Sequence, residues 1–253
     1  GEPLMSKDTW KVLDYIIEEP NPNKNLSLAI NSNLGIPDVL VDRFIEKIQR
    51  ICDEDRVREF IVFTSVDTWG EQAEYIRNGL VFNKFWDNVN KVLEKCPRIN
   101  LTFMVTYNGL SIPNFHKLIN GVYQLKEEYG STDRYWNSAA FLDTSYLRFP
   151  THQTVQTMPQ EWAPKIFEDA QLADFLSVPL FDHKYVGYSD IEIQKIKRTY
   201  DWMKAPVDEE TIKRQQYNFG RYFKAHDERR GTDFKKIFPE FADFYENTQI
   251  MKL

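Results

Sequence analysis

The feature that most limits how this chain can fold is an alternation of short apolar runs with amphipathic stretches through its first 145 residues. The apolar runs are flanked by polar or turn-forming residues, as buried strands usually are, and they occupy residues 26–30, 60–63, 101–105 and 141–142. Between them, hydrophobic residues recur at helical spacing. A repeated strand–helix–strand pattern predicts a parallel sheet with covering helices, and therefore an α/β fold.

Helical spacing extends over residues 7–19, 35–51, 82–93 and 113–128. Ser6 is expected to cap the first of these helices, and Pro20 to stop it. Beyond Pro159 the pattern changes, because residues 162–176, 189–203 and 208–226 all have helical spacing with no strand between them. A further short, aromatic-rich segment spans residues 234–245, where Pro239 interrupts the pattern. We therefore expect an α/β part over residues 1–158 and a helical extension over residues 159–253.

Composition narrows the class of protein. The 253 residues include 32 Lys and Arg against 38 Asp and Glu, which gives a formal net charge of −6 and no basic face for a nucleic acid. No apolar run approaches the roughly 20 residues that a membrane span needs, and no signal peptide opens the chain. We expect a cytoplasmic protein with neither a nucleic-acid nor a membrane partner. The length also suits an α/β barrel.

The metal-ligating side chains are few. Cys52 and Cys96 are 44 positions apart, which matches no metal-binding spacing, and both are expected to be free thiols. The four histidines are too scattered for a zinc site. We assign no metal ligand in this chain.

Polar or small residues follow the predicted strands at four points, which are Gly1-Glu2-Pro3, residues 31–33, residues 64–67 and residues 106–108. Ligands of parallel α/β folds bind at the carboxyl ends of strands, so these residues are candidates for a shared site. The alternative reading is that they are ordinary turn and capping residues. Taken one at a time, the four segments do not separate the two readings.

Taken together, the segments resemble the radical S-adenosylmethionine (radical SAM) superfamily, and in particular its twitch-type members related to peptide-modifying maturases. Gly1-Glu2-Pro3-Leu4-Met5 looks like the last part of the family's Gly-Gly-Glu-Pro signature at the end of the second barrel strand. Ser65-Val66-Asp67, Glu74-Tyr75-Ile76-Arg77 and Phe85-Trp86-Asp87-Asn88-Val89 are similar to its fourth-strand pattern. The similarity runs from Gly1 to about Pro159, and residues 229–233 through Phe238-Pro239 also resemble twitch-type proteins.

The resemblance implies a partial (β/α) barrel of the radical SAM type, a TIM-barrel relative, with about five parallel strands present and Gly1-Glu2-Pro3 ending the first of them. It implies that the parent protein cleaves S-adenosylmethionine to a 5′-deoxyadenosyl radical for hydrogen abstraction. The substrate is unidentified, a peptide or protein being suggested by the related maturases, and an electron-donor protein is implied as partner.

Residue by residue, the resemblance places Gly1 and Glu2 beside the methionyl amino group, and it gives Ser65 and Arg77 the methionyl carboxylate. The full set of candidate cofactor-binding residues is Gly1, Glu2, Asn31, Asn33, Ser65, Asp67, Arg77, Thr106 and Asn108. No catalytic residue is assigned. We predict that Ser65 and Arg77 face one pocket. If these segments are instead ordinary turn and capping residues, Arg77 is expected to pair at the surface with Glu74.

The chain departs from the family at the iron–sulfur cluster. The 4Fe-4S cluster of these enzymes is held by Cys-x-x-x-Cys-x-x-Cys, and neither that motif nor the auxiliary-cluster cysteines occur here. In the family the cluster loop precedes Gly-Gly-Glu-Pro, so we expect a fragment that starts at this signature, lacks the cluster and is inactive alone. The cluster would belong to the parent protein only.

Two other functions remain open. One is a non-enzymatic binding protein on a barrel that has no cluster. The other is a metal-independent barrel hydrolase or aldolase, for which Glu2, Asp67 and Glu74 would be the acid–base candidates.

Overall fold

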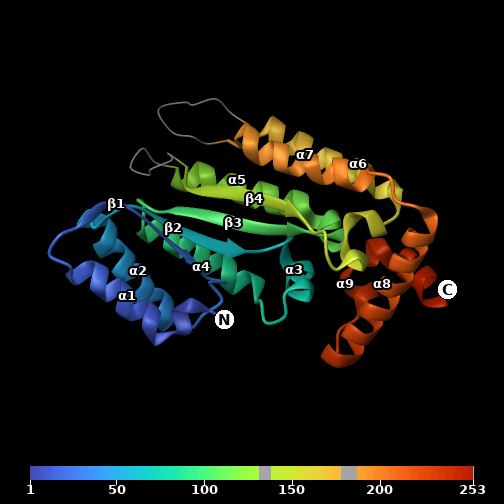
Figure 1. Ribbon diagram of the computed structural model, residues 1–253, viewed down its shortest axis with the longest axis horizontal. Coiled ribbons are helices and arrows are strands. Elements are labelled where there is room, and N and C mark those ends of the chain that lie inside the picture. The colour runs from blue at the N-terminus through green and yellow to red at the C-terminus, as the bar shows by residue number, and fades with distance from the viewer. Residues whose placement is uncertain (131–137, 178–186, 253) are drawn as a thin grey trace.

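The computed structural model describes residues 1–130, 138–177 and 187–252. Its centre is a sheet of four parallel strands in the order β1-β2-β3-β4 (Figure 1). The strands are β1 (Asn23–Asn31), β2 (Val57–Ser65), β3 (Asn100–Tyr107) and β4 (Ala140–Tyr146). The α/β class and the parallel sheet predicted from the alternation are confirmed. All four predicted apolar runs lie inside these strands.

The predicted count of about five strands is wrong for the described residues, which form four. Glu2 caps a short 3-10 helix, Pro3–Met5, so the segment expected to end a strand begins a helix instead. Proline has no N–H for a strand ladder and suits the first turn of a helix, which explains the difference. Within the described residues β1 and β4 each pair with a single strand, so the sheet is open rather than a closed barrel.

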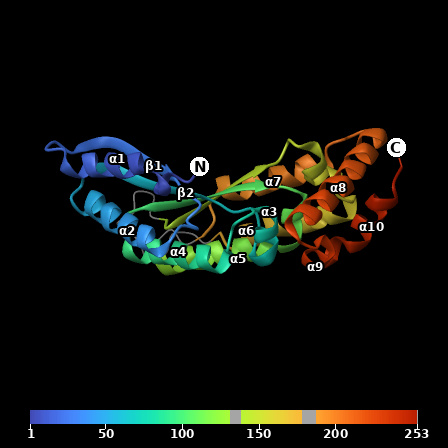
Figure 2. The same ribbon diagram turned by 90° about the horizontal axis from the view of Figure 1, so that it is seen from below.

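One face of the sheet is covered by helices that connect the strands, which are α2 (Asp38–Asp53), α4 (Phe82–Lys95) and α5 (Phe115–Tyr129). The helix α1 (Lys7–Glu18) precedes β1 and packs against α2. Figure 2 shows α2, α4 and α5 next to one another along this face. Aromatic rings join the layers, since Phe44 lies 6.2 Å from Phe60 and Phe85 lies 6.4 Å from Phe103 between ring centroids. Ser6 caps α1 as predicted, because its side chain accepts a hydrogen bond from the Asp8 N–H.

The opposite face of the sheet carries the alternate side chains of each strand. They include Ile61 and Phe63 on β2, and Asn100, Thr102 and Met104 on β3. Met104 is 40% exposed, although parallel sheets are usually covered on both faces. At the far edge, α7 (Asp190–Lys204) packs along β4. This open face contains a cavity that is lined by residues of β2, β3 and β4.

In the described residues that follow β4 the regular elements are all helices, as the sequence predicts. They are α6 (Ala163–Phe175), α7, α8 (Glu209–Arg230), α9 (Phe234–Ile237) and α10 (Ala242–Ile250), with short 3-10 turns between them. The segment expected over residues 234–245 is divided into α9, a 3-10 turn at Pro239–Phe241 and α10, because Pro239 interrupts the helix. The domain boundary after residue 158 stays a prediction. Within the described residues, no helix combines the length and apolar character that crossing a membrane requires.

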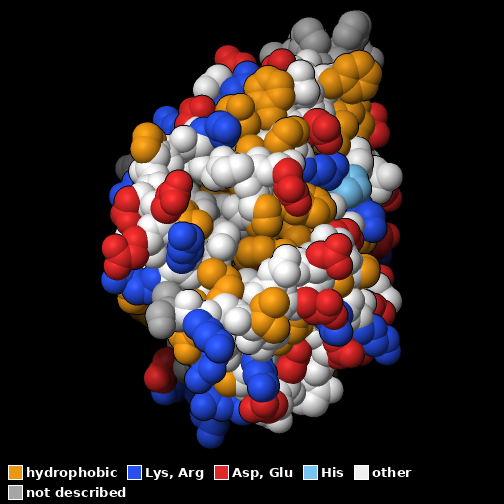
Figure 3. Space-filling view, turned by 90° about the vertical axis from the view of Figure 1, so that its right-hand side faces the viewer, with side chains coloured by type: hydrophobic (Ala, Val, Ile, Leu, Met, Phe, Trp, Pro, Cys, Tyr) orange, Lys and Arg blue, Asp and Glu red, His pale blue; other side chains and the backbone are white. Residues whose placement is uncertain are grey.

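The last helices dock against the carboxyl ends of the strands through α3 (Gly70–Ile76), a helix that the sequence analysis did not separate from the preceding turn. Tyr75 of α3 packs on an aromatic cluster formed by Phe223, Phe234 and Phe238. Figure 3 views this end of the molecule, where hydrophobic side chains gather near the centre among acidic and basic ones.

Candidate functional site

Asp67 contacts two other predicted site residues at the carboxyl ends of β2 and β3. Its Oδ1 accepts hydrogen bonds from the backbone N–H of Thr106 at 2.8 Å and from Nη2 of Arg77 at 3.0 Å. Nε of Arg77 lies 2.8 Å from Oδ2. The guanidinium therefore lies at the strand ends. Arg77 pairs with Asp67 and not, as the alternative reading expected, with Glu74. Glu74 instead accepts a hydrogen bond from the Phe82 N–H at the start of α4.

Local sequence explains how Arg77 reaches this position. Gly70 begins α3 with a φ of +63°, a left-handed conformation that glycine adopts without steric cost. The seven-residue helix ends at Ile76, and the backbone N–H of the next residue, Arg77, donates a hydrogen bond to the carbonyl of Ala73. A turn followed by a short helix thus returns the chain to the edge of the sheet that β2 has just left.

The electrostatics of this cluster follow from burial. Only 6% of the Asp67 side chain is exposed, and desolvation raises the pKa of its carboxyl, although the Arg77 charge and the Thr106 N–H oppose that rise. The Arg77 side chain is 33% exposed. A guanidinium has five N–H donors, so an Arg77 that faces Asp67 on one side keeps donors for a second acceptor. The cluster can therefore hold a ligand carboxylate beside an internal acid.

Three other candidates have local structural roles. Glu2 accepts hydrogen bonds from the Ser32 hydroxyl and the Asn33 N–H, both at 2.8 Å, and so ties the N-terminal segment to the end of β1. Asn33 accepts one from the Gly35 N–H. Asn108 forms a capping box with Ser111 at the start of the 3-10 helix Gly109–Asn114. The capping interpretation of the strand-end residues describes the side chains of Glu2, Asn33 and Asn108 well.

Ser65 and Asn31 lie at strand ends, and their side chains form no hydrogen bond within the described part of the chain. Ser65 is the last residue of β2, is half-buried and, by alternation, faces the same side as Phe63. Asn31 is exposed at the end of β1, where it pairs in register with Phe63. Gly1 is exposed. Among the described residues no side-chain hydrogen bond joins Ser65 to Arg77, so their convergence on one pocket stays a prediction.

The cysteines do not fit the cluster that the resemblance implies. Cys52 lies in the last turn of α2 and Cys96 directly follows α4, and both are buried in the helical layer. Among the described residues no three His, Cys, Asp or Glu side chains gather in a group that could hold a metal ion. The residues present therefore do not fit a 4Fe-4S cluster, and we derive no step through one.

A cavity with basic residues in its lining lies at the end of β4 and was not predicted from the sequence. It is a cavity of about 300 Å³ lined by Ser145, Tyr146, Arg148, Lys195 and Arg198, among others. Lys195 of α7 pairs with Asp143, and Arg148 donates a hydrogen bond to the Tyr146 hydroxyl at 3.0 Å. The residues that follow Leu142 are polar, as at the other strand ends, but the α7 residues are too distant in sequence for spacing to reveal the cluster.

The segment at residues 229–233 that resembles twitch-type proteins forms the corner between α8 and α9. Gly231 ends α8 in the left-handed conformation, with a φ of +65°, and the Asp233 side chain caps α9. Asp227 accepts hydrogen bonds from the Thr232 and Tyr75 hydroxyls at 2.7 and 2.8 Å. The structure thus gives this segment a role in docking α8 and α9 onto α3.

Comparisons with known proteins find no match to this chain among protein-family models, curated proteins or solved structures.

Proposed function

We propose that this chain is the S-adenosylmethionine-binding part of a radical SAM protein, and that the cofactor binds at the carboxyl ends of β1, β2 and β3. The observation that carries the proposal is the Asp67–Arg77 pair, because it holds a partly exposed guanidinium at the strand ends. Ligands of parallel α/β sheets bind at this edge. The open, sequentially ordered sheet agrees with a partial barrel.

The chemistry of the pair suits the amino-acid end of S-adenosylmethionine, which carries a carboxylate and an ammonium group. The free donors of Arg77 are matched to the carboxylate, with the Ser65 hydroxyl completing the cradle. The backbone of Gly1 and Glu2, close to the end of β1 through the Glu2 hydrogen bonds, is the place for the ammonium group. Asn31, Asn33, Thr106 and Asn108 are assigned to the ribose or the substrate.

The redox chemistry belongs to a longer parent protein. An iron–sulfur cluster supplies one electron for cleavage of the cofactor in that family. The residues here do not fit such a cluster, so we assign to this chain the binding of the cofactor and not its cleavage. The electron donor and the peptide or protein substrate are proposed for the parent protein on the resemblance alone.

Titration of the chain with S-adenosylmethionine, followed by NMR chemical-shift changes, tests the proposal. We expect saturable binding that Arg77→Ala weakens by about tenfold or more, the equivalent of one charged hydrogen bond. Arg50→Ala is the matched control, because it also removes an arginine from an arginine–carboxylate pair, on the exposed side of α2. Ser65→Ala provides a second, milder variant. Equal affinity in wild type and Arg77→Ala would remove the assignment.

The hydrolase alternative has less support. Its three carboxylates already serve the structure, since Glu2 holds the end of β1, Asp67 holds Arg77, and Glu74 caps α4. The other alternative, a non-enzymatic binding protein, would show the same S-adenosylmethionine titration as the radical SAM proposal. Iron and sulfide analysis of the parent protein separates these two functions.

A further inference from the structure

The cavity at the carboxyl end of β4 has a lining that suits an anion. Its volume is about 300 Å³, at the small end of the range for ligand sites. Three cationic side chains line it, which are Arg148, Lys195 and Arg198, and its lining among the described residues includes no Asp or Glu. Arg148 and Arg198 are exposed and Lys195 is half-buried, so a ligand in the cavity can reach all three charges.

The packing of α7 along β4 brings these cations together. Lys195 of α7 pairs with Asp143 of β4. Farther along both elements, the ring of Trp202 stacks on that of Tyr146, with 5.1 Å between their centroids. Arg198 follows Lys195 by three residues and therefore lies on the same face of α7, between these two contacts. Its guanidinium is thus placed beside the last residues of β4.

Two of the three cations have no acidic partner in the described part of the chain. The Arg198 guanidinium forms no ion pair or hydrogen bond there, and that of Arg148 donates a hydrogen bond to the uncharged Tyr146 hydroxyl at 3.0 Å. Lys195 is paired with Asp143. The three cations and one acid leave a net charge of +2 at the cavity.

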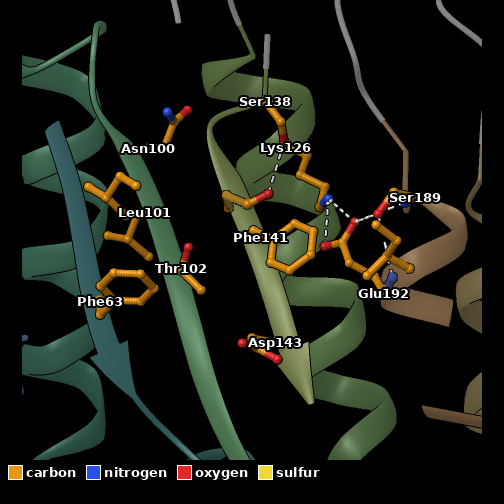
Figure 4. Close-up of a pocket in the computed structure, with 13 residues that line it drawn as sticks. Phe63, Asn100, Leu101, Thr102, Lys126, Ser138, Phe141, Asp143, Ser189 and Glu192 are labelled. Atoms are coloured by element: carbon orange, nitrogen blue, oxygen red, sulfur yellow. Dashed lines mark hydrogen bonds and ion pairs between the residues drawn. The ribbon is translucent and has the colours of Figure 1, made fainter. Parts of the chain in front are cut away.

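The larger cavity on the open face, nearer the start of β4, has no such excess of charge. Its volume is about 510 Å³, and Lys126 and Glu192 are part of its lining. Nζ of Lys126 lies 2.9 Å from both Glu192 carboxylate oxygens, so these two charges are paired (Figure 4). The unpaired arginines distinguish the cavity at the end of β4.

The guanidinium of Arg148 is held in place by an aromatic stack. Its central carbon lies 5.2 Å from the centroid of the Tyr146 ring, which itself stacks on Trp202. The cation–π contact and the hydrogen bond to Tyr146 restrict a long side chain, so a ligand that binds Arg148 loses less conformational entropy. A guanidinium has five N–H donors, and several stay available to a ligand.

We propose that this cavity binds the phosphate group of a small molecule, held by Arg148 and Arg198, with the exposed Ser145 hydroxyl as a further donor. A phosphate group carries a charge of about −1.5 to −2 near pH 7, which matches the charge of the cavity. The forked donors of arginine suit its oxygens. The site lies at the carboxyl edge of the sheet, where ligands of parallel α/β folds bind. It is independent of the S-adenosylmethionine proposal, because its residues belong to α7 and to the end of β4.

Titration of the whole chain with three anions at constant ionic strength near pH 7, followed by NMR chemical-shift changes, tests the proposal. The anions are inorganic phosphate, glycerol 3-phosphate and acetate. We expect saturable binding of both phosphates, with shifts at Ser145 and Arg198, and at least tenfold weaker binding of acetate, because acetate carries a single charge. A preference between the two phosphates identifies the ligand as free phosphate or as a phosphate ester.

Substitutions of the two arginines locate the site. Arg148→Gln and Arg198→Gln change exposed side chains, so both should fold, and each should weaken phosphate binding by about tenfold. Arg221→Gln is the control for Arg148, because Arg221 also lies over a tyrosine ring, 5.3 Å from the centroid of Tyr217. Lys197→Gln is the control for Arg198, because it removes a positive charge from α7 at a residue outside the lining. Both controls should bind phosphate as the wild type does.

Four results would overturn the proposal. The first is a wild-type chain that binds neither phosphate saturably, and the second is equal binding of phosphate and acetate. The third is unchanged phosphate affinity in both Arg148→Gln and Arg198→Gln. The fourth is a tenfold loss in Arg77→Ala or Lys197→Gln, since phosphate would then bind at the Asp67–Arg77 pair or respond only to the overall charge of α7.

Discussion

Asp67 connects residues that are far apart in the sequence, because its carboxylate faces both the Thr106 backbone and the Arg77 guanidinium. Asp67→Asn keeps an oxygen for the Thr106 N–H but removes the counter-charge of Arg77. Since Arg77 is one-third exposed, water screens part of that loss. We expect a decrease of about 1–2 kcal/mol in the free energy of unfolding, measured by urea denaturation. Asp243→Asn, at an exposed position on α10, is the control; equal stability of wild type and Asp67→Asn would show that the pair contributes nothing to folding.

Asp169 is a buried acid on α6 that should make stability depend on pH. Burial raises the pKa of its carboxyl to about 8, and its Oδ2 accepts a hydrogen bond from the Tyr107 hydroxyl at 3.4 Å. The folded state therefore keeps a proton that the unfolded state loses near pH 4. Because the folded state binds more protons, the free energy of unfolding should fall as pH rises from about 4 to about 8.

Asp169→Asn removes this titration and mimics the protonated acid. Thermal unfolding of the two proteins at pH 5 and pH 8 checks the prediction. The variant should gain stability relative to wild type by about 1 kcal/mol or more at pH 8, and the difference should shrink at pH 5. A constant difference between the two pH values would mean that Asp169 does not titrate in this range.

At the level of secondary-structure elements, one ion pair joins α5, α7 and β4. Lys126 of α5 contacts Glu192 of α7, and Glu192 accepts the Leu142 N–H at the edge of β4. Lys126→Met leaves a buried carboxylate without its counter-charge, which should cost about 3–5 kcal/mol of folding stability. Adding Glu192→Gln to that variant should recover part of the loss, because the remaining buried group is neutral. Denaturant unfolding measures both, and a small effect of Lys126→Met alone would contradict this account.

The elements that the sequence predicted best are those with a strong local signal. The runs at residues 60–63 and 101–105 lie within β2 and β3, and the cap at Ser6 starts α1 as expected. The short helix α3 was missed because seven residues hold too few turns to establish a helical period. The edge contact of Glu192 could not be predicted at all, since it depends on a tertiary arrangement of α5, α7 and β4.

Part of the candidate site could also be predicted, because polar residues at the ends of strands give a local signal. Asp67 and Thr106 lie at strand ends that parallel topology brings to one edge, so the sequence pattern placed these two residues in the same region. Arg77 follows α3 and was assigned to this region only through the family resemblance. Their mutual contacts were not predictable, because the sequence offered Glu74 as an equally good partner for Arg77.

At the scale of the whole molecule, the described sheet has four strands, with helices covering one face and a largely open second face. Both cysteines lie in the helical layer shortly before β2 and β3 begin, at the end of the sheet opposite the proposed cofactor site. We therefore predict that anaerobic reconstitution of this chain with iron and sulfide yields no stoichiometric 4Fe-4S cluster, as measured by iron and sulfide content. A full cluster that persists after Cys52→Ser and Cys96→Ser would show that other ligands exist.

The central claim is that the strand ends around Arg77 hold the amino-acid end of S-adenosylmethionine. The most direct measurement is a crystal structure of the chain with S-adenosylhomocysteine, which has the same amino-acid end. We predict that the ligand carboxylate lies about 2.7–3.1 Å from donors of Arg77 and Ser65, with the Asp67–Arg77 pair retained. A ligand bound elsewhere, or a saturated crystal in which Arg77 contacts Asp67 alone, would contradict the claim.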